Sequence, residues 1–151
     1  MKLDGGVLYL TCKYGDKFLV LITEVKNQGT NDLRLLKGKK HQAKENAIER
    51  LGKNMIGFRT FLLNESIFPF ICFGYGCDFE DGSSILDRVV TIAMFGSVNK
   101  IYLHNTSLFN RGSFFFRPNA WRPEEMFNIM YQIAKGSIFY YFSKYGDNRF
   151  L

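Results

Sequence analysis

Three charged residues near the start of the chain have the types and spacing of a metal-dependent phosphodiesterase. Asp4 precedes two glycines, and Glu24 and Lys26 stand two residues apart at the end of an apolar segment. Residues i and i+2 of a strand point to the same face, so Glu24 and Lys26 are expected side by side. Two carboxylates can hold a hard divalent cation, while an ammonium steadies the phosphate and the attacking water. We therefore predict a catalytic site of Asp4, Glu24 and Lys26, with Asp4 and Glu24 as metal ligands.

Two apolar segments are expected to bring these charges together. Residues 6–13 and 17–26 are rich in strand-forming side chains and are joined by a turn at residues 14–16, which predicts a β-hairpin. Pairing about that turn places the stretch at Asp4 near Glu24. A surface ion pair of little energetic value is the alternative. We favour a catalytic site because an apolar strand is expected to be central, where charges are costly unless a partner or metal compensates them.

The rest of the chain alternates between helical and strand patterns. The patterns predict an amphipathic helix over residues 42–64 and a strand covered on both faces over residues 68–73. A second helix over residues 83–95, two short strands over residues 100–104 and 113–117, and a last helix over residues 122–144 follow. The segment after residue 29 is interpreted as a basic loop. This order predicts an α/β fold in one domain over residues 1–151, with a mixed central sheet of about five strands that opens with a β-hairpin and carries helices on both faces.

Charge favours an acidic partner. The net charge is +6, and six basic residues gather within seventeen positions: Lys37, Lys39, Lys40, Lys44, Arg50 and Lys53. This clustering makes DNA the stronger candidate, and a solvated helix face is the alternative. Three cysteines do not form a disulfide framework, so they are expected to be reduced. Because no stretch is as apolar as a secretory signal or a membrane span, we expect a cytoplasmic protein without a membrane partner.

Several segments resemble the EcoRI-like type II restriction endonucleases, in collinear order over almost the whole chain. The most specific agreement is Asn46-Ala47-Ile48-Glu49-Arg50, followed by Lys53-Asn54. Asp4-Gly5-Gly6 and residues 24–29 also agree, and fainter agreement continues through residues 65–69, 86–88, Trp121 and residues 126–130.

The resemblance implies an endonuclease of the PD-(D/E)xK superfamily that acts as a homodimer on a palindrome in double-stranded DNA. It implies Mg²⁺ held by Asp4 and Glu24, with Lys26 as the third catalytic residue. It also implies a set of DNA-binding residues: Ala43, Asn46, Ala47, Glu49, Arg50, Lys53 and Arg88. The expected site contains AATT, with GAATTC favoured, and a cognate DNA methyltransferase is expected in the same system.

The chain also departs from the family pattern. Family members carry a substantial part before the Asp-Gly-Gly segment, so we expect the chain to lack their N-terminal part. Ile85 stands where the family shows an arginine, which weakens the prediction of the outer base pair. Three alternatives are kept: a structure-specific nuclease such as a junction resolvase, an inactive DNA-binding remnant, and a purely structural protein.

Overall fold

The fold is an α/β arrangement in which a four-stranded sheet lies between two helices. The computed structural model describes residues 5–27, 30–40, 45–76 and 114–151. Among these residues the sheet has the order β1-β2-β3-β4. The mixed sheet predicted from the sequence is confirmed with four described strands, whereas the strand and the helix expected at residues 100–104 and 83–95 lie outside the described residues.

The predicted hairpin is formed by β1 (Gly6–Thr11) and β2 (Lys17–Asn27), which pair in antiparallel fashion. The turn closes with a hydrogen bond from the Cys12 amide to the Asp16 carbonyl oxygen, 2.9 Å. Gly15 has a φ of 87° in this turn, a conformation that glycine adopts without a steric cost. The strands are therefore joined where the sequence pattern predicted.

A β-bulge in β2 sets which side chains share the face of the catalytic candidates. Leu8 pairs with Leu21 and Tyr9 with Leu19, so Val20 is an extra residue in β2. A bulge shifts the alternation of a strand by one position. After it, Ile22 packs under α2 with Leu19, and the residues at every second position beyond Ile22 share that face.

Two parallel strands extend the sheet beyond β2. β3 (Phe70–Tyr75) pairs with β2, and β4 (Phe114–Arg117) pairs with β3, both in parallel. β2 therefore lies in the interior of the sheet, as the apolar sequence predicted, and Glu24 is the register partner of Cys72. β3 is buried along almost its whole length, which confirms the prediction of a strand covered on both faces.

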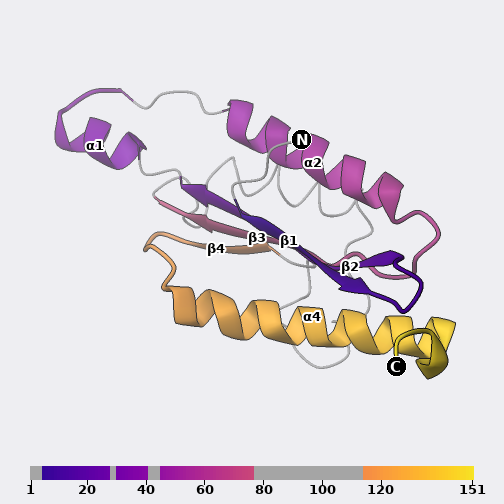
Figure 1. Ribbon diagram of the computed structural model, residues 1–151. Coiled ribbons are helices and arrows are strands. Elements are labelled where there is room, and N and C mark those ends of the chain that lie inside the picture. Colours follow the sequence, from indigo (N-terminus) through magenta and orange to yellow (C-terminus); the bar gives the residue numbers. More distant parts are fainter. Residues whose placement is uncertain (1–4, 28–29, 41–44, 77–113) are drawn as a thin grey trace.

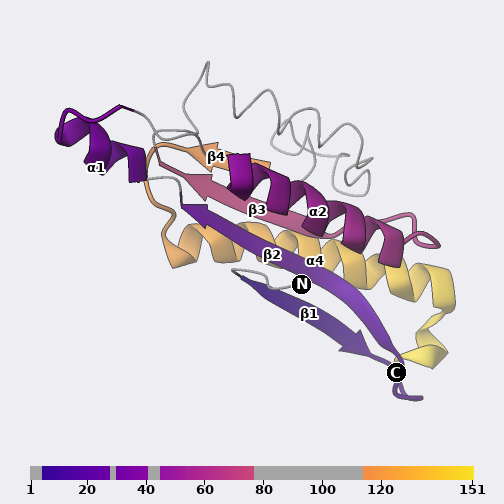
Figure 2. The same cartoon turned by 90° about the horizontal axis from the view of Figure 1, so that it is seen from above.

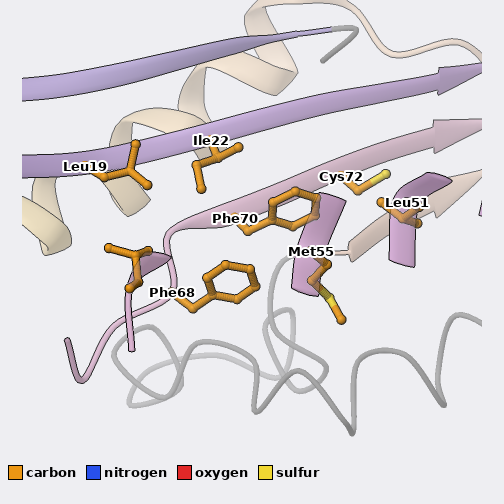
Figure 3. Packing of buried hydrophobic residues seen from close by; sticks show 8 residues of the cluster. Leu19, Ile22, Leu51, Met55, Phe68, Phe70 and Cys72 are labelled. Atoms are coloured by element: carbon orange, nitrogen blue, oxygen red, sulfur yellow. The ribbon is translucent and has the colours of Figure 1, made fainter. Parts of the chain in front are cut away.

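Helices cover the two faces of the sheet, as predicted (Figure 1). α2 (Glu45–Phe61) packs on one face, where Leu51 and Met55 contact side chains of β2 and β3 (Figure 3). α4 (Pro123–Tyr145) covers the other face through Ile133 and Ala134. Each face thus has its own apolar cluster. The turned view in Figure 2 shows α2 and α4 on opposite sides of the sheet.

The basic loop predicted after residue 29 is wrong over its first part, where Thr30–Leu36 forms α1. Leucine and arginine favour a helix, and this propensity outweighs the basic, glycine-punctuated composition of the surrounding segment. The helix ends at Leu36, and Gly38, two residues later, has a φ of 62°. The Gly38 amide donates to the Leu35 oxygen at 2.9 Å and the Lys39 amide to the Arg34 oxygen at 2.8 Å, which satisfies carbonyls at the end of the helix.

Most aromatic side chains of residues 114–116 and 139–142 pack within the protein, whereas Phe139 is exposed. Phe115 and Tyr141 are buried, and Phe114 and Phe116 pack against the cluster under α2. Cys12 and Cys72 are free and buried, in agreement with the expectation of reduced cysteines. Across the described ranges, no helix combines the length and the apolar character needed to cross a bilayer. A short 3₁₀ helix, η4 (Asp147–Arg149), follows α4.

Candidate active site

Glu24 and Lys26 form a buried ion pair on the face of β2 that α2 covers. The Lys26 Nζ atom lies 2.5 Å from Glu24 Oε1, and the two side chains are 9% and 0% exposed. The prediction that these residues lie side by side is thereby confirmed. Two charges removed from water in this way cost free energy unless their partners compensate it. The burial marks this pair as different from an ordinary surface salt bridge.

Asn54 of α2 completes the contacts of the same carboxylate oxygen. Its Nδ2 donates a hydrogen bond to Glu24 Oε1 over 3.1 Å, and Asn54 is itself buried. Asn54 belongs to a segment that resembles the family, but its residue type and spacing alone indicated no role for it. A signal was present, because this polar residue lies three positions after Leu51 and directly before Met55, both of which are fully buried on the apolar face of α2.

The second oxygen of Glu24 has no hydrogen-bond partner among the described residues, although it is buried. A buried carboxylate oxygen without a donor is costly, and a divalent cation is one way to compensate it. The surroundings of Glu24 are therefore compatible with its carboxylate acting as a metal ligand. The described part of the chain contains no cluster of three or more His, Cys, Asp or Glu side chains around it.

The surroundings of Glu24 on β3 are apolar. Cys72 is its register partner, and burial raises the pKa of the Cys72 thiol, with the nearby Glu24 charge acting in the same direction. The thiol thus stays protonated and behaves as a small apolar side chain. On the opposite face of β2, the Thr23 hydroxyl contacts Met130 Sδ of α4 at 3.3 Å. Packing on both faces therefore holds this part of the strand.

The backbone before β1 approaches β2 closely beside Glu24. A Cβ atom on Gly5 would lie 2.1 Å from the Thr23 carbonyl oxygen, so only glycine fits there without a shift. Asp4, the predicted second metal ligand, directly precedes Gly5 in the sequence and lies outside the described residues. The predicted meeting of Asp4 with Glu24 and Lys26 stays a prediction.

The predicted DNA-binding residues of the described chain lie on the N-terminal half of α2. Asn46 and Ala47 belong to its first turn. Glu49, Arg50 and Lys53 are exposed, so they face away from the sheet. The start of α2 lies toward the same end of the molecule as the end of β2 (Figures 1 and 2). Ala43 and Arg88 lie outside the described residues.

A second polar cluster, which was not predicted, joins the segment after α2 to the C-terminal part of α4. Glu65 accepts hydrogen bonds from the Tyr140 hydroxyl, the Lys144 ammonium and the Tyr145 hydroxyl at 2.9, 2.7 and 2.7 Å. Burial raises the pKa of Glu65, but these hydrogen bonds outweigh that effect and lower it overall. The cluster fixes the segment after α2 against α4, and its role is structural.

Comparisons with known proteins agree with this geometry. The family model described as restriction endonuclease EcoRI matches residues 1–84. The chain is 30% identical to the type II restriction enzyme EcoRI of Escherichia coli over an alignment that covers 91% of this chain and 64% of that protein. It is 26% identical to the type II restriction enzyme RsrI of Cereibacter sphaeroides, with 89% of this chain and 62% of that protein covered.

The chain therefore spans less than two thirds of the length of these two relatives. The family model, however, matches more than half of the 151 residues, and it includes β1, β2 and α2, which carry the buried pair and its asparagine. The resemblance predicted from the sequence is confirmed. The chain belongs to the EcoRI restriction endonuclease family.

Proposed function

We propose that this chain is a type II restriction endonuclease that cuts double-stranded DNA with Mg²⁺ at a palindrome containing AATT, with GAATTC favoured. The observation that carries the proposal is the buried Glu24–Lys26 pair beside α2, in which one oxygen of the Glu24 carboxylate has no partner among the described residues. Family membership supports the same activity, because the matched relatives are named as type II restriction enzymes.

In the proposed site, Glu24 and Asp4 hold the metal and Lys26 contacts the reacting phosphate. When bound, Mg²⁺ would supply Lewis-acid polarisation of the phosphate and a lowered pKa of water. Lys26 has two roles in this site. Its ammonium compensates the charge of the Glu24 carboxylate, and it can also neutralise negative charge on the phosphate. Its burial removes competing water from this ammonium and strengthens the interaction.

Base recognition is assigned to the first turns of α2 on one protomer and its symmetry mate. An asparagine such as Asn46 offers a donor and an acceptor that match adenine N6 and N7. Exposed Arg50 and Lys53 are available to base edges and phosphates. A palindromic site requires two copies of this helix, so we propose a homodimer. A cognate methyltransferase and a cytoplasmic location belong to the same proposal.

Cleavage of linear DNA that contains one GAATTC site tests this function. Wild-type protein should cut at that site when Mg²⁺ is added and should not cut a site with a changed central base pair. Glu24→Gln keeps the shape and an acceptor for Asn54 but removes the charge. Its cleavage rate should fall by at least about a hundredfold, because metal catalysis contributes several kcal/mol. Glu124→Gln, the same change at an exposed position of α4, is the matched control.

Other results would assign the chain to a different function. Salt-sensitive DNA binding without cleavage under any metal condition would identify a binding protein, since phosphate contacts alone give that salt dependence. Cleavage that prefers branched DNA over a linear GAATTC duplex would identify a structure-specific nuclease. Cleavage that survives unchanged in Glu24→Gln would refute the assignment of the site.

A further inference from the structure

Asn54 is placed where it can control a metal ligand without touching the metal itself. Its side-chain nitrogen lies 3.1 Å from Glu24 Oε1, and Asn54 is 8% exposed. The neighbouring positions on this face of α2 are apolar, namely Leu51 and Met55. A polar side chain in such a face costs free energy unless it is hydrogen-bonded. Its position is therefore explained by its contact with Glu24.

We propose that Asn54 is a positioning residue through which helix α2 orients the Glu24 carboxylate for the metal. The proposal rests on the function proposed above. Lys26 and Asn54 both contact Oε1, from β2 and from α2, so the carboxylate is held from two elements. This arrangement directs Oε2, which has no partner in the described part of the chain, to the position of a metal ligand. Groups that hydrogen-bond a ligating carboxylate fix its orientation and tune metal affinity.

The same helix links this contact to DNA recognition. Arg50 precedes Asn54 by one helical turn, and Asn46 precedes it by about 12 Å along the axis. A helix transmits displacement along its length with little deformation, so a movement of the first turns on DNA also moves Asn54. DNA and metal binding should then be coupled, and coupling of two binding equilibria is reciprocal.

Magnesium titrations by calorimetry, with and without a GAATTC duplex, test the proposal. Asn54→Leu keeps a similar volume and removes the donor. We expect its Mg²⁺ affinity to fall by about 10–100-fold, the range for lost partners of metal ligands. The apparent Mg²⁺ constant for cleavage should rise by the same factor, while the rate at saturating Mg²⁺ changes by less than about threefold. Thr60→Val, on the exposed face of the same helix, should leave both constants unchanged.

A measurement on the wild-type protein covers the case in which Asn54→Leu does not fold. The side-chain amide signals of Asn54 in an NMR spectrum should shift on Mg²⁺ addition, whereas those of exposed Asn128 should not. An unchanged Asn54 signal, or an Asn54→Leu variant that is less stable but binds Mg²⁺ like wild type, would overturn this inference alone. Wild-type protein that neither binds Mg²⁺ nor cuts DNA would overturn the proposed function as well.

Discussion

Replacing Lys26 by methionine should destabilise the metal-free protein by about 3–5 kcal/mol, far more than an ordinary lysine substitution. The change keeps most of the aliphatic stem and removes the ammonium. Glu24 is fully buried, and among the described residues it would keep only the hydrogen bond from Asn54. A buried carboxylate that loses its counter-charge has neither water nor a cation to compensate it.

The magnitude follows from the geometry of the pair. At 2.5 Å and an effective dielectric constant of about 20, the attraction between the two charges is about 7 kcal/mol. In the Lys26→Met variant no ammonium has to leave water on folding, so several kcal/mol of desolvation cost are recovered. The lost attraction exceeds the recovered desolvation cost by a few kcal/mol, in agreement with the range observed when one partner of a buried pair is removed. The energetic coupling between residues 24 and 26 should vanish once Glu24 is replaced by a neutral residue.

A double-mutant cycle of Lys26→Met and Glu24→Gln, followed by urea unfolding in the presence of EDTA, measures the coupling free energy of the pair. In the Glu24→Gln background, Lys26→Met should cost at least about 2 kcal/mol less than in wild type. Lys135→Met, at an exposed position of α4, is the control and should stay within about 0.5 kcal/mol of wild type. A cost of Lys26→Met below about 1 kcal/mol, or one equal in both backgrounds, would refute the reasoning.

Two further predictions concern the strand start and pH. Gly5→Ala would place a Cβ 2.1 Å from a β2 carbonyl oxygen, so thermal unfolding should show that the free energy of unfolding falls by more than about 2 kcal/mol. Gly6→Ala is the control, because a Cβ at Gly6 meets nothing within 4 Å. Equal losses in the two variants would contradict the prediction. The hydrogen bond from Arg117 lowers the pKa of Glu125 from 4.5 to about 2. Because the folded pKa is the lower one, this stabilisation is present above about pH 4.5 and is lost as the pH falls toward about 2. Melting temperatures across that range should depend less on pH in Glu125→Gln than in wild type or Glu124→Gln. Parallel curves of melting temperature against pH would show that the Arg117–Glu125 contact does not contribute to stability.

Local patterns were sufficient to predict the elements that carry the site. The hairpin, the buried strand β3 and the last helix follow from alternation, apolar runs and turn residues, which act over a few positions. The shared face of Glu24 and Lys26 follows from the two-residue period of a strand. The predicted helix over residues 42–64 was too long, because α2 ends at Phe61 and Leu63 is exposed.

Other features depend on contacts between distant parts of the chain. The bulge at Val20 arises from the pairing of β1 with β2 and has no clear sequence signal. The hydrogen bond between Asn54 and Glu24 joins residues 30 positions apart, and it forms because α2 packs across this face of the sheet. The contacts of Glu65 with α4 span still longer separations, up to 80 positions.

The sequence by itself determined the family, the order of the elements and the charged residues at the end of β2, because these depend on residue types and short-range periodicity. Only the tertiary structure decided how that charge is held. The packing of α2 on β2 and β3 removed Glu24 from water, and the same packing supplied Asn54 as a donor and left one carboxylate oxygen without a partner in the described residues. Burial and hydrogen bonding across elements are set by three-dimensional packing, which sequence spacing does not specify.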